Sequence, residues 1–301
     1  WGTFAVGITI PIAMGVGLYH KRTGNLKLAT TVGFILIMLA IVLGPNIQGT
    51  WIGDLLTLEK STLAIILPIY AFFAAALPVW LLLAPRDYLS TFMKIGVFAA
   101  LIVGVFIVNP EVQFPAFTEF INGGGPVVAG PVWPFISITI ACGAISGFHA
   151  FVGSGTTPKM VNRWKDIKGV AFGAMLVECL VAIMALIAAI SLQPGDYFAI
   201  NSSPEAFAKL GMTVVDLPVL SEAIGMDLEG RTGGAVTLAV GMASIFSGVE
   251  WFSHLTAYFY QFVIMFEAVF ILTAIDAGTR TARYLIQDFL GNVYKPLKKT
   301  D

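Results

Sequence analysis

Long runs of apolar residues constrain this chain more than any other feature. A helix that crosses a bilayer needs roughly 20 predominantly apolar residues. Hydrophobic residues make up 57% of the 301 residues and charged residues 12%, whereas a soluble domain is about half apolar and about a quarter charged. The sequence therefore predicts an all-α, polytopic membrane protein with a multi-span helical bundle. The eight stretches near spanning length are Gly2–Tyr19, Leu28–Gly44, Thr62–Ala84, Leu89–Val108, Val132–Val152, Gly169–Leu192, Gly233–Val249 and Thr256–Ala277.

We expect residues 1–301 to form one transmembrane domain that is part of a longer protein, because Trp1 is not an initiator residue and no charged leader precedes it. The longest polar connection is Gln193–Arg231, which is rich in acids and turn formers. We expect it to form an extracytoplasmic loop or cap. Within it, Ser203 and Pro204 have the pattern of a helix start, with Ser203 as N-cap and Pro204 at the first helical position.

Basic residues predict the orientation, because short cytoplasmic loops carry an excess of Lys and Arg. They follow the first, third and fifth stretches, which are therefore expected to end in the cytoplasm. After the eighth stretch, residues such as Arg280 and Arg283 would lie outside if all eight stretches crossed. We expect Gly233–Val249 to be re-entrant or broken; an outward C-terminus is the alternative. The basic residues of the three cytoplasmic connections are Lys21, Arg22, Lys27, Arg86, Lys159, Arg163, Lys165 and Lys168.

Charge and cysteine content exclude several classes of protein. Lys and Arg total 17 against 18 Asp and Glu, a net charge of -1, so there is no basic excess to bind nucleic acid. Cys142 and Cys179 lie in apolar stretches and have no metal-site spacing. The zinc motif HExxH is absent. We expect no metal, no cofactor and no enzymatic activity.

The stretch Ala141–Lys159 combines glycines with hydroxyl side chains and is a poor continuous helix. A helix interrupted at the membrane midplane exposes backbone groups and a half-helix dipole, which bind substrates or ions in broken-helix secondary transporters. A glycine face for tight helix packing is the alternative. We predict discontinuous helices here, with a site for a substrate carboxylate or a coupling ion. The candidate substrate-binding residues are Ser146, Gly147, His149, Ser154, Thr156 and Thr157.

Two carboxylates lie inside apolar stretches and are candidates for proton coupling. Glu178 shares a helix face with several alanines, and Glu267 lies in the last stretch. Intramembrane ionisable residues are functional by default, although a protonated Glu178 donating a hydrogen bond to backbone is the alternative. His149 is either a proton relay or a packed side chain.

Four further charged residues are candidates for a gate or an ion pair. Arg86 and Asp87 follow Pro85 at the predicted inner edge of the third stretch, where interfacial anchoring is the alternative role. Asp276 lies four residues before Arg280 on one helix face, so this pair is expected to form an ion pair at the cytoplasmic end.

Three blocks of the sequence strongly resemble the carbon starvation protein A family. They are PVWLLLAPRDYLSTFMKIG (Pro78–Gly96), ITIACGAISGFHAFVGSGTTPK (Ile138–Lys159) and FEAVFILTAIDAGTRTARYLIQDFLG (Phe266–Gly291). The resemblance implies a multi-pass inner-membrane protein of prokaryotes, linked to nutrient limitation and to uptake of peptides or pyruvate by cation symport. The family often has Pro at Val236 and His at Gln261, so a proton relay through that His is not available here.

We therefore predict a secondary active transporter that imports a small organic nutrient, a peptide or a pyruvate-like carboxylate. We expect the coupling ion to be a proton or sodium, and the partners to be the lipid bilayer and the substrate. In the transport cycle the binding site would open alternately to the two sides of the membrane. A membrane channel and a nutrient sensor are the rival functions. A channel would give fast, non-saturating downhill flux, and a sensor would need a signalling output.

Overall fold

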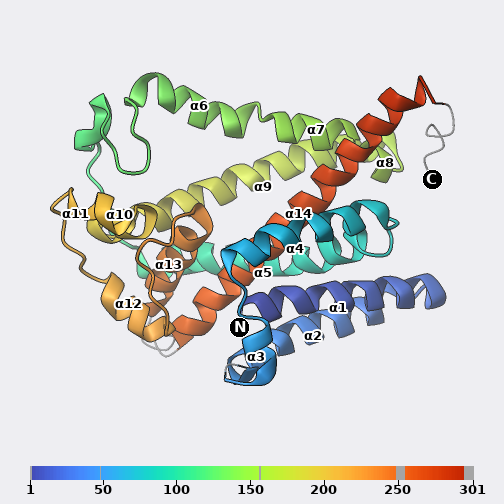
Figure 1. The fold of residues 1–301 in the computed structure, drawn as a ribbon, viewed down its shortest axis with the longest axis horizontal. Helices are drawn as coiled ribbons and strands as arrows, with labels where there is room; N and C mark the ends of the chain where they lie inside the picture. Colours follow the sequence, from blue (N-terminus) through green and yellow to red (C-terminus); the bar gives the residue numbers. More distant parts are fainter. Residues whose placement is uncertain (1, 48, 156, 249–254, 295–301) are drawn as a thin grey trace. The chain divides into compact units, whose positions relative to one another are not determined.

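The computed structural model describes residues 2–47, 49–155, 157–248 and 255–294 (Figure 1). The described residues are mainly helical and contain no β-strand. The helices are α1 (Gly2–Thr23), α2 (Leu26–Leu43), α3 (Trp51–Leu55), α4 (Lys60–Ala76), α5 (Leu83–Val108), α6 (Val132–Ala144), α7 (Gly147–Gly155), α8 (Thr157–Met160), α9 (Trp164–Ile190), α10 (Pro194–Asn201), α11 (Pro204–Ala208), α12 (Leu217–Ile224), α13 (Gly234–Ser247) and α14 (Thr256–Gly291), with 3-10 turns at Gly44–Ile47 and Glu119–Asn122.

Five helical segments in the described part of the chain are long and apolar enough to cross a membrane. They confirm the prediction of an all-α, multi-pass membrane protein. Three of the predicted stretches form shorter apolar helices instead. The five segments are Gly2–Thr23, Leu26–Ile47, Leu83–Val108, Trp164–Ile190 and Thr256–Gly291, and the shorter ones are Ser61–Ala76, Val132–Ala141 and Gly234–Ser247.

The helix α4 ends earlier than the predicted stretch Thr62–Ala84 because of a proline. Leu77, which precedes Pro78, is extended with φ -69° and ψ 150°. The ring of a proline disfavours helical geometry in the residue before it. The apolar composition of residues 77–84 therefore does not continue the helix.

The residues group into two compact units, and each is described by itself. Unit 1 comprises Trp1–Met93, Ile145–Gly169 and Met265–Asp301, and unit 2 comprises Lys94–Ala144 and Val170–Ile264. The division falls within α5, α9 and α14.

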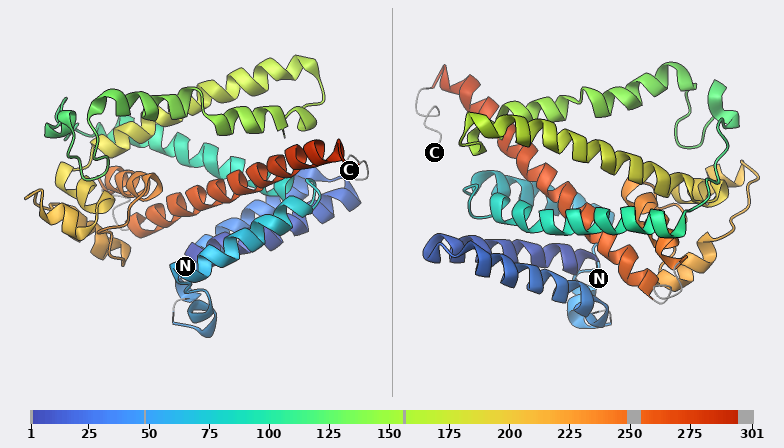
Figure 2. Two further views of the ribbon diagram at one scale, coloured as in Figure 1. Left: turned by 45° about the horizontal axis from the view of Figure 1, so that its top comes forward. Right: turned by 180° about the vertical axis from the view of Figure 1, so that it is seen from behind.

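In unit 1, α1 and α2 lie side by side as an antiparallel hairpin (Figures 1 and 2). The Asn25 side chain accepts a hydrogen bond from the Leu28 N–H at 3.2 Å and caps α2. Small residues allow the two helices to approach closely: a Cβ built on Gly33 would lie 2.9 Å from Cγ2 of Val16. Such contacts replace the hydrophobic effect, which does not act between helices in lipid.

In unit 2, the connection Gln193–Arg231 folds into the short helices α10, α11 and α12. Ser203 accepts a hydrogen bond from the Ala206 N–H at 3.2 Å with Pro204 at the start of α11, which confirms the predicted helix start. The fully buried Asp196 accepts hydrogen bonds from the N–H groups of Val215 at 2.8 Å and Asp216 at 2.9 Å. This carboxylate ties the start of the connection, at α10, to the segment directly before α12.

Also in unit 2, α13 is one continuous helix of 14 residues, so its glycines do not break it. A Cβ on Gly241 would lie 2.3 Å from the carbonyl oxygen of Ala188 in α9. Gly241 is therefore required for close packing of two helices. At about 1.5 Å per residue the helix is about 21 Å long, shorter than the roughly 30 Å hydrocarbon core. Whether Gly233–Val249 is re-entrant stays a prediction.

Candidate functional site

A buried ion pair joins two membrane helices inside unit 1. The Nη2 atom of Arg86, in the first turn of α5, donates to Oδ2 of Asp276 in α14 at 2.6 Å. The two side chains are only 2% and 1% exposed. Charged groups inside a membrane are expensive and are retained where they pair or carry function.

The phenol of Tyr70 in α4 completes this cluster. Its hydroxyl donates to Oδ2 of Asp276 at 3.1 Å and accepts a hydrogen bond from Nη1 of Arg86. One hydroxyl thus contacts both charges, so three helices meet at the ion pair. No local pattern of residues pointed to Tyr70, since a tyrosine in an apolar stretch is common.

Two further arginines of α14 bind the C-terminal end of α4. Nη2 of Arg280 donates to the carbonyl oxygen of Ala74 at 2.5 Å, and Nη1 of Arg283 donates to that of Ala75 at 2.7 Å. The last carbonyls of a helix lack partners within the helix and carry partial negative charge. The carbonyls therefore offset the positive charges that Asp276 alone does not balance.

Several polar atoms of the cluster retain hydrogen-bonding capacity. Nε of Arg86, Oδ1 of Asp276 and Nε of Arg280 are buried, with no hydrogen-bond partner among the described residues. A cavity of about 10 Å³ adjoins Arg86, Ser90 and Thr9, which is the space needed for about one water molecule. Buried polar groups generally have partners, so these three atoms are the part of the cluster that the described residues leave unsatisfied.

The structure changes the environment predicted for two arginines. We expected Arg86 in a short cytoplasmic loop and Arg280 beyond the last span, but both lie within helices and are 2% exposed. The reason is that α5 begins at Leu83 and α14 continues to Gly291. A buried arginine cannot contact a lipid headgroup. Neither residue therefore supports the predicted orientation of the chain in the membrane. Asp87 is half-buried next to Arg86 and its backbone oxygen accepts from Ser90 at 2.8 Å.

The predicted substrate segment is interrupted at Ile145 and Ser146, between α6 and α7. Oγ of Ser146 accepts from the Phe148 N–H at 3.2 Å, at the start of α7. Gly147, His149 and Ser154 are exposed, Ser146 and Thr157 are half-buried, and Thr156 lies outside the described residues.

Within this segment one glycine serves close packing. A Cβ on Gly155 would lie 2.1 Å from Cγ2 of Thr281 in α14, whereas a Cβ on Gly143, Gly147 or Gly153 would meet nothing within 4 Å among the described residues. The packing explanation that the sequence left open is thus supported for Gly155.

The two predicted proton-coupling residues lie in different surroundings. Glu178 is exposed on α9 in unit 2, and Glu267 is half-buried on α14 in unit 1. Their coupling roles stay predictions. In the described part of the chain, no group of three or more His, Cys, Asp or Glu side chains is placed to hold a metal ion.

Comparisons with known proteins give a consistent result. The model of the family described as carbon starvation protein CstA matches residues 1–301. The chain is 79% identical over 301 residues to the peptide transporter CstA of Bacillus subtilis, covering 100% of this chain and 50% of that protein. It is 42% identical over 343 residues to the pyruvate/proton symporter BtsT of Escherichia coli, covering 100% of this chain and 47% of that protein. The chain spans about half the length of the curated relatives it matches. No solved structure matches.

Proposed function

The chain belongs to the carbon starvation protein CstA family, and from this membership we propose that it is part of a secondary active transporter importing a small organic nutrient with a proton. Relatives named as a peptide transporter and as a pyruvate/proton symporter support this class of function. Peptides and pyruvate share a carboxylate, so a carboxylate-bearing nutrient is the proposed substrate. The proposed location is the inner membrane, with Gln193–Arg231 as an extracytoplasmic cap.

The buried Arg86–Asp276 pair is the observation that carries the proposal. A purely structural contact between membrane helices needs no charges, and burying two charges is costly even when they pair. An ion pair between helices also has two discrete states, closed and separated, which is what a gate requires. Arg86 and Asp276, with neighbouring Asp87 and Arg280, are the proposed gate.

The substrate and proton roles are proposed on the residues that the sequence singled out. The interrupted segment binds the substrate carboxylate or a coupling ion through Ser146, Gly147, His149, Ser154, Thr156 and Thr157. The start of α7, directly after the interruption at Ile145 and Ser146, supports this role, because a helix N-terminus attracts anions. Glu178 or Glu267 carries the proton.

Transport by the full-length protein in proteoliposomes tests the proposal. Labelled pyruvate and a labelled short peptide are offered separately, with an inward pH gradient, an inward sodium gradient or none. We expect saturable uptake of one of them that collapses with the pH gradient. Uptake driven by a sodium gradient alone would identify sodium as the coupling ion. Fast, non-saturating flux without a gradient would indicate a channel instead.

The residue assignments need a second comparison in the same vesicles. Glu178→Gln and Glu267→Gln are compared with Glu205→Gln, an exposed acid of the cap. At least one of the two should abolish pH-driven accumulation while the control retains it. If both variants accumulate substrate like the control, the proton assignment is wrong, although the transport function stands.

A further inference from the structure

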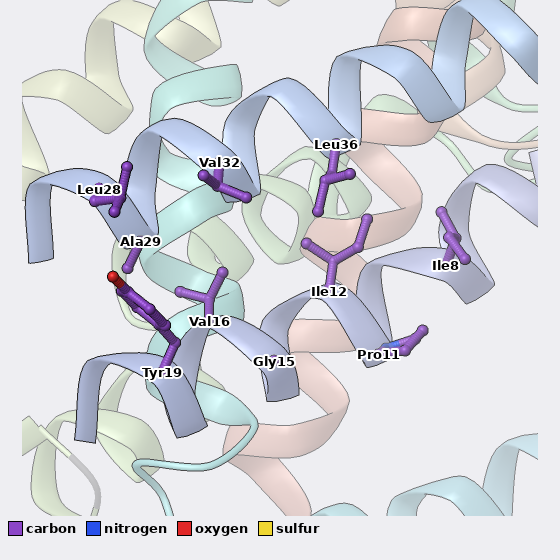
Figure 3. Close-up of a pocket in the computed structure, with 10 residues that line it drawn as sticks. All are labelled: Ile8, Pro11, Ile12, Gly15, Val16, Tyr19, Leu28, Ala29, Val32 and Leu36. Atoms are coloured by element: carbon purple, nitrogen blue, oxygen red, sulfur yellow. The ribbon is translucent and has the colours of Figure 1, made fainter. Parts of the chain in front are cut away.

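An open apolar groove runs between α1 and α2 of unit 1 (Figure 3). It has a volume of about 400 Å³. As Figure 3 shows, one wall carries Ile8, Ile12 and Val16 of α1, and the other carries Leu28, Val32 and Leu36 of α2. Gly15 also lines the groove, and a Cβ added there would meet nothing within 4 Å.

One side of α1 is packed and the groove side is open. A Cβ on Gly17 would lie 2.9 Å from the carbonyl oxygen of Trp80, so the connection before α5 covers that side. On the groove side, Leu28, Val32 and Leu36 are 47%, 45% and 43% exposed. Both helices are long and apolar enough to span the bilayer, so the groove lies at the depth of the lipid chains.

The length of the groove matches one leaflet. From Ile8 to Tyr19 the lining of α1 extends about 16 Å at about 1.5 Å per residue. Half of the roughly 30 Å hydrocarbon core is about 15 Å. A single acyl chain that enters at the Tyr19 end therefore reaches the bilayer midplane within the groove.

The Tyr19 end of the groove adjoins a turn with a positive charge. Lys21, Arg22 and Lys27 are exposed there, and the first acidic residue of the chain is Asp54. The ammonium of Lys21 lies 3.7 Å from the centroid of the Trp80 ring, a cation–π contact on the side of α1 that the connection before α5 covers. Arg22 and Lys27 are therefore the basic side chains of the turn that remain for a ligand in the groove. A cationic turn beside an apolar groove is complementary to a phosphate group that carries an acyl chain.

We propose that the groove and the basic turn form a binding site for one anionic phospholipid, with an acyl chain between α1 and α2 and the headgroup phosphate at Arg22 and Lys27. The site lies outside the proposed gate and substrate segment and does not depend on the transport activity. A bound lipid would fill the groove and hold the α1–α2 hairpin in the bilayer.

Lipid retention by the full-length protein tests the headgroup half of the site. The protein is purified from vesicles that hold equal phosphatidylglycerol and phosphatidylcholine of one chain length, and retained lipids are counted by native mass spectrometry. Arg22→Gln and Lys27→Gln should each weaken phosphatidylglycerol retention roughly fivefold, as expected for one basic residue at an anionic surface. The control combines Arg163→Gln, Lys165→Gln and Lys168→Gln, which replace exposed basic residues that do not line this groove.

Cross-linking tests the acyl half. Phosphatidylglycerol with a photoreactive chain end should label peptides within Ile8–Leu36, and Gly15→Leu, which fills the groove, should reduce that labelling severalfold. Gly7→Leu is the control on the same helix, because its added side chain also meets nothing within 4 Å and Gly7 does not line the groove.

Three outcomes would overturn the site. The first is equal retention of the two lipids, and the second is equal loss in the control and test variants. The third is a cross-link from the groove to another segment of the protein or to a second copy, since a protein surface would then occupy the groove.

Discussion

Arg86 and Asp276 form an ion pair that is almost completely buried within unit 1. Removing one partner of a buried ion pair leaves an uncompensated charge, which is far more costly than the pair itself is stabilising. The Tyr70 hydroxyl forms hydrogen bonds with both partners. The two charged side chains therefore cannot move apart without breaking one of these bonds. The loss of either charge should therefore affect folding as well as gating.

We predict that Asp276→Asn destabilises the protein by about 3 to 5 kcal/mol, because Arg86 then stays buried without a counter-charge. Thermal unfolding of the full-length protein in detergent measures this. Asp288→Asn is the matched control, since Asp288 is an exposed aspartate of the same helix. Replacing both partners with Arg86→Met and Asp276→Leu should recover part of the loss. Equal melting of the Asp276 and Asp288 variants would show that the pair has no structural role.

At the scale of helices, contacts between elements explain features that look local in the sequence. Arg280 and Arg283 follow a long apolar run, yet they cap a helix some two hundred positions earlier in the chain. The glycines of α13 resemble a break in the sequence, yet Gly241 serves a backbone contact with α9. In both cases the partner helix gives the residue its role.

We predict that Gly241→Ala destabilises unit 2 by about 1 to 3 kcal/mol, the usual cost of overpacking. Its Cβ would lie 2.3 Å from a backbone oxygen of α9, which no rotamer change relieves. Amide hydrogen exchange in α13 should rise, and the melting temperature should fall. Gly234→Ala on the same helix has open space around it and should be neutral. The same change in both variants would argue against close packing of α9 and α13.

At the scale of the whole molecule, the orientation in the membrane now depends on fewer basic residues. The burial of Arg86 and Arg280 removes them from the count of loop charges. The turn with Lys21, Arg22 and Lys27 and the group Arg163, Lys165 and Lys168 remain exposed. Both groups still predict a cytoplasmic location by the positive-inside rule.

We predict that Leu26→Cys and Trp164→Cys react with a membrane-impermeant maleimide only from the cytoplasmic side. Glu205→Cys, in the proposed cap, should react only from the opposite side. All three positions are exposed, and the variants are built after replacing the native cysteines, including Cys142 and Cys179. Labelling of Leu26→Cys from the cap side would invert the proposed orientation.

The fold class could be predicted from the amino-acid sequence alone, because only helices satisfy every backbone group within one segment in lipid and runs of apolar residues are local. The sequence also located the start of α11, since an N-cap is decided by neighbouring residues. The predicted length of α4 was too great, because hydropathy does not register the effect of Pro78 on the backbone of Leu77. The sequence singled out Arg86 and Asp276 as charges in or beside apolar stretches, without indicating that they pair.

Which of these residues contact one another became clear only from the packing of the helices. Asp276 bonds to Arg86, which is 190 positions away, while Arg280 donates to Ala74, 206 positions away. Likewise, Gly155 and Gly241 are required by a side chain or a carbonyl of another helix. Local composition determines whether a segment enters the bilayer, because the energy of transfer is a sum over its residues. The partner of a buried charge depends on how distant helices pack, which no local pattern records.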